Sequence, residues 1–562
     1  MQIPNSIQEA PKRRDASLQD CAFLTLLVLL SVISYVTRLG FYTDDWNMFA
    51  TLLSSHNQSF LFLFRLLLSG NMRMRPAQVL YLTLLYKLFG LHPLGYHIMT
   101  AALMATMACL LYLSVSLLTH SRFIAIAISS VYILLPNYST DRIWLSVPAN
   151  LSMTLCFLNL YALLTTARTC GPAVLFWAAL SVLTFAASAL AYEVAMPLLV
   201  VNLALAIWQG RCKLSVKNTG EFSMGLGLAI VGNFAALASV MLFKLKTTVR
   251  PYSESVSLPW IEYVAKGAMR VHFVAFGIRL PYILYCAVRQ NSQWENYVLA
   301  GFLALGVVLY AKRAFDPDKD RMLGADTFKL IACGILVFAA GNAIFLVTPR
   351  VLEFGYAVTG AVNRVNIAAS VGVAIIVIGV IRLAASIIAR DTVRSTVESS
   401  LVAFVCMAGF LINNSVASLW SRAYSMQLEV LADIVAHIPS IPHGATVILD
   451  GVCPYIGPGI VFECFWDIGP ALEILHHDWT LQADVVSSRM EVGERGLTTT
   501  IYRVTKYYPY SGNLIIYNFE SKRTERLIDA ETARRYFQTR GLTLRHDCSP
   551  GRVGYGASIC GS

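Results

Sequence analysis

The chain alternates between long apolar runs and short polar segments as far as about residue 421. Runs of about 20 apolar residues are long enough to cross a bilayer as helices. The clearest runs cover 20–38, 96–118, 121–136, 148–167, 172–190, 193–209, 222–243, 296–311, 327–347, 366–388 and 399–420. The pattern therefore predicts a polytopic α-helical membrane protein with about eleven spans.

Two further apolar stretches do not fit this pattern of spans. Residues 76–91 begin with proline and carry a lysine near their end, and residues 268–288 carry Arg270, His272 and Arg279. Charged residues inside a span are costly. We expect both stretches to lie along the membrane interface as helices.

The composition changes after the last apolar run. Short β-rich runs such as 445–449 and 514–517 are bounded by Gly, Pro and Asn, as strands are. Residues 422–438 and 530–540 have a helical pattern. We therefore predict a soluble α/β or α+β domain over residues 422–562, large enough for a core of its own.

Composition and charge agree with a membrane protein. Hydrophobic residues make up 56% of the 562 positions and charged residues only 14%, whereas a soluble domain is about 25% charged. The net charge of +11 comes from short basic clusters between the apolar runs. A nucleic-acid partner is therefore not expected.

The basic clusters predict the orientation of the chain, because Lys and Arg concentrate in cytoplasmic loops. Residues 1–19 contain Lys12, Arg13 and Arg14 and are expected to be a cytoplasmic tail. With eleven spans, the basic loops 211–217, 312–321 and 390–394 also lie inside. Residues 20–421 then form the transmembrane domain of a multi-pass protein of the inner or plasma membrane, and the C-terminal domain lies outside.

The twelve cysteines fall into two groups. Eight lie in or beside apolar runs and are expected to be small buried hydrophobes. The other four, Cys453, Cys464, Cys548 and Cys560, belong to the C-terminal domain. In an oxidising compartment they would form one or two disulfides, and their spacing leaves all three pairings open.

Candidate chemistry begins directly after the first span. Asp44 and Asp45 follow it, and Arg73 and Arg75 follow them. Carboxylates at the mouth of an apolar segment are costly to keep unless they have a function. Solvated loop residues are the alternative explanation of an isolated Asp-Asp pair.

With eleven spans, polar residues from several loops gather on the outer side. After the first loop come the loop of Asn137, Tyr138, Asp141, Arg142 and Trp144, the turn of Tyr192 and Glu193, the loop of Lys244, Lys246, Arg250 and Tyr252, and the loop of Arg350, Glu353, Tyr356 and Arg364. Arginines bind phosphate and a carboxylate can remove a proton from an acceptor. Such a set suits an anionic lipid-linked substrate. Lys244 also fits a lysine that snorkels at the end of a span.

The run from Asp44 to Trp46, then Arg75-Pro76, then Phe89 to His97 resembles the N-terminal module of the GT-C glycosyltransferase superfamily, in particular protein O-mannosyltransferase-like members. The turn from Ala191 to Pro197 is similar to their short glutamate turn. The resemblance covers about residues 20–210. It implies a GT-C-like fold and an inverting transferase on the outer leaflet, with a polyprenyl-phosphate-linked sugar as donor.

By the same resemblance, Asp44 or Asp45 is the catalytic base or a metal ligand, and Glu193 is the turn glutamate. A cofactor is not required, although the paired carboxylates could hold a divalent metal. The tail departs from the animal O-mannosyltransferases because it has no tetratricopeptide pattern. The acceptor, whether glycolipid, glycan or protein, is therefore open.

The expected site residues fall into three groups. The catalytic candidates are Asp44, Asp45 and Glu193; the phosphate-binding candidates are Arg73, Arg75, Arg142, Lys246, Arg250 and Arg364; and the substrate-lining candidates are Trp46, Tyr138, Tyr192 and Tyr252. We expect the three carboxylates to line one outward cavity together with Arg142 or Arg250. Loss of Asp45 is expected to stop turnover while the fold stays intact.

Two other functions fit parts of the pattern. A transporter or flippase for a lipid-linked substrate would need broken helices in two similar halves. A membrane-anchored binding protein would leave eleven spans without a purpose.

Overall fold

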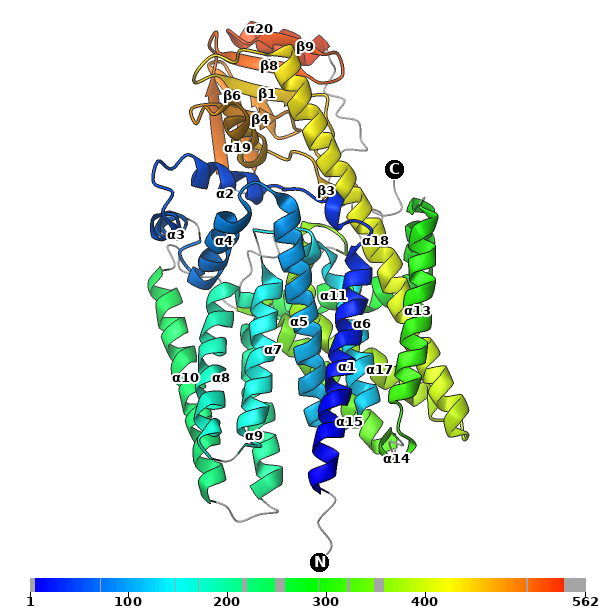
Figure 1. The fold of residues 1–562 in the computed structure, drawn as a ribbon. Helices are drawn as coiled ribbons and strands as arrows, with labels where there is room; N and C mark the ends of the chain where they lie inside the picture. Colours follow the sequence, from blue (N-terminus) through cyan, green and yellow to red (C-terminus); the bar gives the residue numbers. More distant parts are fainter. Residues whose placement is uncertain are drawn as a thin grey trace, which may run out of the picture.

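Most of the apolar runs form long helices. The computed structural model describes residues 6–70, 72–146, 148–169, 171–214, 220–247, 258–291, 293–320, 324–347, 358–501 and 504–539. The long helices are α1 (Ser6–Val32), α5 (Pro93–Thr119), α7 (Ala149–Thr166), α8 (Ala173–Ala191), α9 (Met196–Leu214), α10 (Gly220–Thr247), α13 (Trp294–Ala314), α15 (Gly324–Asn342), α17 (Ile367–Ala385) and α18 (Asp391–His437). They form a bundle that carries the strand-containing domain on one end (Figure 1).

The predicted polytopic architecture is confirmed. Among the described residues, nine helices are long and apolar enough to cross a membrane, or up to eleven if two bent pairs each count as one span. The first pair is α6 (Arg122–Leu134) with the 3-10 helix η2 (Pro136–Arg142), bent by 63°. The second, Pro259–Ile278 with α12 (Leu280–Gln290), is bent by 70°. This pair covers the stretch 268–288, for which the charged residues predicted an interfacial helix.

Short helices gather beside the C-terminal domain. They are α2 (Asp44–Leu53), α3 (Phe60–Ser69) and α4 (Pro76–Phe89), which lie together at this end of the bundle (Figure 1). Proline at the first helical position starts α4, because its fixed φ suits a helix and its missing N–H has no partner there. The predicted interfacial helix at 76–91 is therefore a short helix, and it is not among the candidate spans.

The predicted boundary at residue 422 falls inside a continuous helix. Helix α18 runs unbroken for 47 residues, from the far end of the bundle into the C-terminal domain (Figure 1). Leu419, Trp420 and Ala423 on either side of the predicted boundary are all buried. The last span and the C-terminal domain are therefore joined rigidly and not by a linker.

The described basic segments lie at the opposite end of the bundle. The beginning of α1, the end of α9, helix α14 (Pro317–Asp320) and the beginning of α18 share this end (Figure 1). The arrangement agrees with the prediction that the basic segments share one side, because these four helix ends lie together.

Close helix packing depends on glycine at the contact between α15 and α17. A Cβ atom on Gly372 would lie 2.3 Å from the backbone nitrogen of Phe338, and one on Gly341 would lie 2.5 Å from the Cα of Ala369. Small residues let helix backbones approach when the surrounding lipid is as apolar as the side chains. At the basic end, the buried Asp20 accepts three hydrogen bonds from Arg122, two from Nε at 2.7 and 3.1 Å and one from a terminal nitrogen at 2.6 Å, which ties α1 to α6.

The C-terminal domain is built on a four-stranded sheet in the order β4-β1-β8-β9. Strand β1 (Thr446–Asp450) is parallel to β4 (Gln482–Val485) and to β8 (Leu514–Asn518), and β9 (Arg523–Arg526) is antiparallel to β8. Every residue of β8 is buried, as expected of a central parallel strand. Helix α19 (Phe465–His476) connects β1 to β4, and α20 (Ala530–Thr539) ends the described chain. The predicted strand-containing domain is confirmed, with α/β topology.

Smaller sheets complete this domain. Strands β2 (Tyr455–Ile456) and β3 (Gly459–Ile460) form a hairpin, and β5 (Met490–Val492), β6 (Gly496–Ile501) and β7 (Val504–Pro509) form an antiparallel sheet.

The cysteines differ from the two expected groups. Cys453 is disulfide-bonded, but so is Cys286 on α12, which had been counted as a small buried hydrophobe. Cys464 is a free, buried thiol, so it does not take part in the expected pairings. Cys548 and Cys560 lie outside the described residues.

Candidate active site beside the C-terminal domain

The aspartate pair begins helix α2. Thr43, directly before the pair, has a positive φ of 42°, which is uncommon for a β-branched residue. Its hydroxyl oxygen accepts a hydrogen bond of 3.1 Å from Nε1 of Trp466 in the C-terminal domain. The two aspartates then occupy the first turn of α2, where the free backbone N–H groups favour negative charge. The C-terminal domain thus touches the chain beside the aspartates.

Asp45 is a buried side chain that holds two segments together. Its Oδ2 accepts from the backbone N–H of Tyr42 at 3.0 Å, and its Oδ1 accepts from the backbone N–H of Ser146 at 2.8 Å. The side chain is fully buried. Burial raises the pKa of Asp45 to about 7, and the two backbone hydrogen bonds act in the opposite direction. Both oxygens are therefore occupied in joining the first loop to the loop after η2.

Asp44 has a different environment, although it is the next residue in the chain. It is exposed and lines a cavity of about 770 Å³ between α2 and the C-terminal domain. Loss of hydration raises the pKa of Asp44, while the positive charges of Arg364 and Arg75 act to lower it. Asp44 is thus an accessible carboxylate within electrostatic reach of two arginines.

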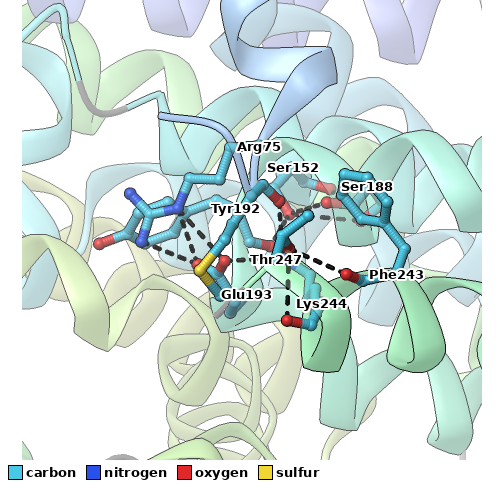
Figure 2. A network of polar contacts seen from close by, with 9 residues as sticks. Arg75, Ser152, Ser188, Tyr192, Glu193, Phe243, Lys244 and Thr247 are labelled. Atoms are coloured by element: carbon cyan, nitrogen blue, oxygen red, sulfur yellow. Dashed lines mark hydrogen bonds and ion pairs between the residues drawn. The ribbon is translucent and has the colours of Figure 1, made fainter. Parts of the chain in front are cut away.

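Glu193 is the centre of an ion cluster (Figure 2). Its Oε2 lies 2.9 Å from a terminal nitrogen of Arg75, and its Oε1 lies 2.7 Å from Nζ of Lys244. Nε of Arg75 donates to both carboxylate oxygens, at 3.2 and 3.0 Å. Arg75 also lies over the ring of Tyr192, 4.4 Å from its centroid. One carboxylate therefore orients two cations from distant parts of the chain.

Local sequence explains why these three charges meet. Arg75 is the residue before the proline that starts α4, and Glu193 begins the 3-10 helix η3 (Glu193–Ala195) that leads into α9. Lys244 lies in the last turn of α10. Carboxylates are stabilised at helix N-termini and cations at helix C-termini. Lys244 also donates to the carbonyl oxygen of Met74 at 3.2 Å, which fixes the segment before α4.

The second arginine near Asp44 comes from the 3-10 helix η6 (Ala361–Asn366) before α17. The guanidinium of Arg364 lies 4.1 Å from the ring centroid of Trp144. Its neighbour Asn363 holds η6 against η2, since it accepts from the backbone N–H of Thr140 at 3.0 Å and donates to Ser139 Oγ at 2.9 Å. The site therefore combines segments from α2, α4, α9, α10 and η6.

Three predicted site residues lie elsewhere. Arg142 was expected to bind phosphate, but its guanidinium is buried and donates to Ile133 O and to Ser31 Oγ. Tyr138 was expected to line the substrate, but it is buried and its hydroxyl donates to Tyr132 O at 2.6 Å. The side chain of Trp46 is also buried, and its Nε1 donates to Gln427 at 3.2 Å. All three point inward because their polar atoms find partners inside the bundle or at its junction with the C-terminal domain.

The other predicted residues have varied positions. Tyr192 belongs to the site through its contact with Arg75. Arg73 is half-buried in the loop before α4, and Lys246 is exposed at the end of α10. Arg250 and Tyr252 lie outside the described residues.

Lys244 was missing from the predicted site because a snorkelling lysine explained it equally well. The structure shows instead a buried lysine paired with Glu193. Residues two apart on a helix point about 200° away from each other, so only one of Lys244 and Lys246 can face the bundle. Periodicity could have shown that one of them is internal, but not which one.

Within the described part of the chain, no group of three or more His, Cys, Asp or Glu side chains is arranged to hold a metal ion. A second cavity, of about 640 Å³, lies at the opposite end of the bundle and is lined by Arg122, Arg168 and Arg313 among others.

Comparison with known proteins gives only distant likenesses, and these are to solved structures. Neither a protein-family model nor a curated protein sequence matches this chain. Among solved structures, ArnT from Cupriavidus metallidurans bound to undecaprenyl phosphate is 15% identical, over 76% of this chain and 82% of that chain, with a TM-score of 0.33. The apo structure of the same protein is 14% identical over 77% and 82%, with a TM-score of 0.32. These scores describe a loose similarity in the arrangement of the chains, so the function is inferred from this chain's own residues.

The two aspartates should respond differently to the same substitution. In Asp45→Asn, the amide can keep at most one of the two backbone hydrogen bonds and turns its NH₂ group toward the other N–H. We expect this change to cost about 1–3 kcal/mol of stability. Asp44→Asn should leave the unfolding temperature unchanged because this side chain is exposed. The measurement is thermal unfolding of both full-length variants in one detergent.

Equal unfolding temperatures for Asp45→Asn and the unsubstituted protein would contradict the structural role of Asp45. A fall for Asp44→Asn as large as that for Asp45→Asn would contradict the distinction between the two carboxylates.

Proposed function

We propose that this chain is a membrane glycosyltransferase that moves a sugar from a polyprenyl-phosphate carrier to an acceptor at the outer face, with inversion at the anomeric carbon. The observation that carries the proposal is that Asp44, an accessible carboxylate that lines the cavity, feels the positive charges of Arg75 and Arg364. A base for the acceptor and cations for a phosphate are thereby combined in one site. The GT-C resemblance of residues 20–210 supports the same reaction.

In this reaction, the acceptor hydroxyl oxygen attacks the anomeric carbon of the donor sugar on the face opposite the phosphate. A new bond forms between the acceptor oxygen and the anomeric carbon while the bond between that carbon and the phosphate oxygen breaks. The electron pair of the broken bond stays on the phosphate. The proton of the acceptor passes to Asp44. Attack from the opposite face inverts the anomeric centre.

The cations are suited to the leaving phosphate. Phosphate needs charge stabilisation rather than protonation, and preorganised cations in a partly desolvated site supply it. Arg75 remains one-third exposed although it pairs with Glu193. The site contains three cations, Arg75, Lys244 and Arg364, and two carboxylates, Glu193 and Asp44. One net positive charge therefore remains for the phosphate. Glu193, held by two cations, is a positioning residue and Asp44 is the base.

The site lies where a lipid-linked donor would present its phosphate. Lys244 lies in the last turn of α10 and Glu193 begins the span that contains α9, so both lie at the ends of candidate spans. Cys286 and Cys453 are both disulfide-bonded, which favours an oxidising compartment for the C-terminal domain. The basic segments at the other end favour the cytoplasm there. Together they support a cytoplasmic N-terminus and an extracytoplasmic site.

A transporter or flippase is a second candidate, because the structure contains two broken helices. They meet each other, since Asn137 Nδ2 lies 2.6 Å from His272 Nδ1. Moving a substrate across the membrane needs no proton acceptor at Asp44, whereas forming a glycosidic bond does. Substitution of Asp44 therefore separates the two functions.

Asp44→Asn should stop sugar transfer without stopping donor binding. Loss of a general base lowers the rate by about 10²–10⁴-fold. In cells that lack the chain, mass spectrometry of glycolipids, polysaccharides and glycoproteins should find one glycoconjugate without a sugar. Asp44→Asn should fail to restore that sugar, and the purified variant should still bind undecaprenyl phosphate.

Asp326→Asn is the matched control, because this carboxylate pairs with Lys329 on the exposed surface of α15. It should restore the sugar fully. Restoration by Asp44→Asn to the level of the control would rule out the proposed base.

Arg364→Gln should shift the pH dependence of transfer. Arg364 lowers the pKa of Asp44, so its removal leaves the loss of hydration less opposed and that pKa rises. Asp44 is then protonated, and inactive as a base, up to a higher pH. The acid limb of kcat/KM for the donor should therefore move to higher pH, as measured in detergent with saturating acceptor.

Arg489→Gln removes an exposed positive charge from the C-terminal domain and should leave the acid limb in place. An unmoved limb in Arg364→Gln, or a shift to lower pH, would refute the electrostatic link between Arg364 and Asp44.

A further inference from the structure

The cavity beside Asp44 belongs mostly to the C-terminal domain. Helix α2 contributes Asp44 and Asn47, and the remaining lining comes from α19, the loop after it, β4 and β7. Its volume of about 770 Å³ falls in the range of roughly 300–1,000 Å³ that is typical of ligand pockets. The cavity therefore joins the candidate base to a domain whose role the proposed reaction leaves open.

Aromatic rings are concentrated in this cavity. Four of its lining residues are Phe465, Trp466, Trp479 and Tyr508. Trp466 is fixed by its hydrogen bond to Thr43, and Tyr508 by a hydrogen bond of 3.0 Å to Asp484. Trp479 is 37% exposed. Rings held in this way offer rigid apolar faces at little entropic cost.

Polar groups lie between the rings. Lys506 Nζ is 5.0 Å from the ring centroid of Phe465. Asn47 and Glu473 also line the cavity, and burial raises the pKa of Glu473 to about 7. Thr480 continues the lining beside Trp479. The cavity thus combines apolar faces with hydrogen-bonding groups.

We propose that this cavity binds the acceptor and that the acceptor is a carbohydrate. The inference rests on the proposed transferase function and adds the class of its second substrate. A sugar ring has an apolar face of C–H groups and an edge of hydroxyl groups, so it needs aromatic faces beside polar side chains. An extended peptide would instead use a free sheet edge or apolar grooves. The cavity offers aromatic faces and polar groups, with the base at one end.

The geometry also separates the two substrates. Arg75 lies directly before α4 and Lys244 lies in the last turn of α10, whereas the cavity is lined by α2 and the C-terminal domain. Asp44, at the start of α2, belongs to the cavity and is within reach of Arg75. A carbohydrate in the cavity would therefore lie beside Asp44, the proposed base, and apart from the Glu193 ion cluster.

Trp479 is the residue whose removal tests the inference with least risk to the fold. It is partly exposed, and its loop is held independently by Asp478, whose Oδ1 accepts from the backbone N–H of Thr480 at 3.0 Å and whose Oδ2 lies 2.8 Å from His443 Nδ1. Tyr507 is the matched control. It is 52% exposed on β7 and is not part of the cavity lining.

The experiment measures binding to the full-length protein in detergent by saturation-transfer NMR. The probes are maltotetraose, chitotetraose and mannotetraose, with a threonine-rich hexapeptide as a hydroxyl-bearing probe of another class. At least one tetrasaccharide should bind the unsubstituted protein. Trp479→Ala should weaken that binding by about 10-fold or more, and Tyr507→Ala by less than about twofold.

Three results would overturn the inference: binding of none of the tetrasaccharides, binding of the hexapeptide alone, or equal weakening by Trp479→Ala and Tyr507→Ala. The assay contains no polyprenyl-phosphate donor. Failure of the proposed transfer with retained tetrasaccharide binding is therefore distinguishable from failure of this inference.

Discussion

The site depends on one shared carboxylate. Glu193 holds Arg75 and Lys244 at the end of an apolar bundle, where an unpaired charge is costly. Pairing reduces that cost and fixes both cations relative to α4, α9 and α10. Because two cations share one carboxylate, positive charge remains available. The same ion cluster therefore accounts for the packing of three helices and for the affinity for phosphate that we propose.

Asp44 and Asp45 lie in the same helix turn but have different roles: Asp45 has a structural role, and Asp44 has the chemical role that we propose. Successive residues of a helix point about 100° apart, so Asp45 faces the protein and Asp44 faces the cavity. Asp45 joins two loops through backbone hydrogen bonds. Asp44 is left accessible beside the C-terminal domain. The burial of Asp45 and its two hydrogen bonds indicate a structural role in addition to the one expected from the sequence.

The large-scale architecture was predictable because it depends on which segments of the chain are in the bilayer and which are in water. Apolar runs of bilayer length predict spans, and alternation of turns and β-rich runs predicts the C-terminal domain. Elements that depend on tertiary contacts were not predictable. The sequence predicted helix on both sides of residue 422 but not that α18 continues through it. Pro281 marks the start of α12 but does not give the 70° bend of the 259–290 segment.

The candidate site was predictable in its composition and not in its geometry. The sequence indicated Asp44, Arg75, Glu193 and Arg364, because charges beside spans are unusual. It also indicated Arg142, whose guanidinium is buried among backbone and hydroxyl oxygens. A charge at the end of a span looks the same in sequence whether it faces a cavity or the interior. Only the partners of each side chain distinguish the two cases.

The most direct test of the account is the position of the phosphate in an experimental structure of the full-length protein with bound undecaprenyl phosphate. The account predicts that the phosphate lies within hydrogen-bonding distance, about 3 Å, of Arg75 or Arg364 and on the same side as Asp44. A phosphate bound instead in the cavity of Arg122, Arg168 and Arg313, at the other end of the bundle, would contradict it.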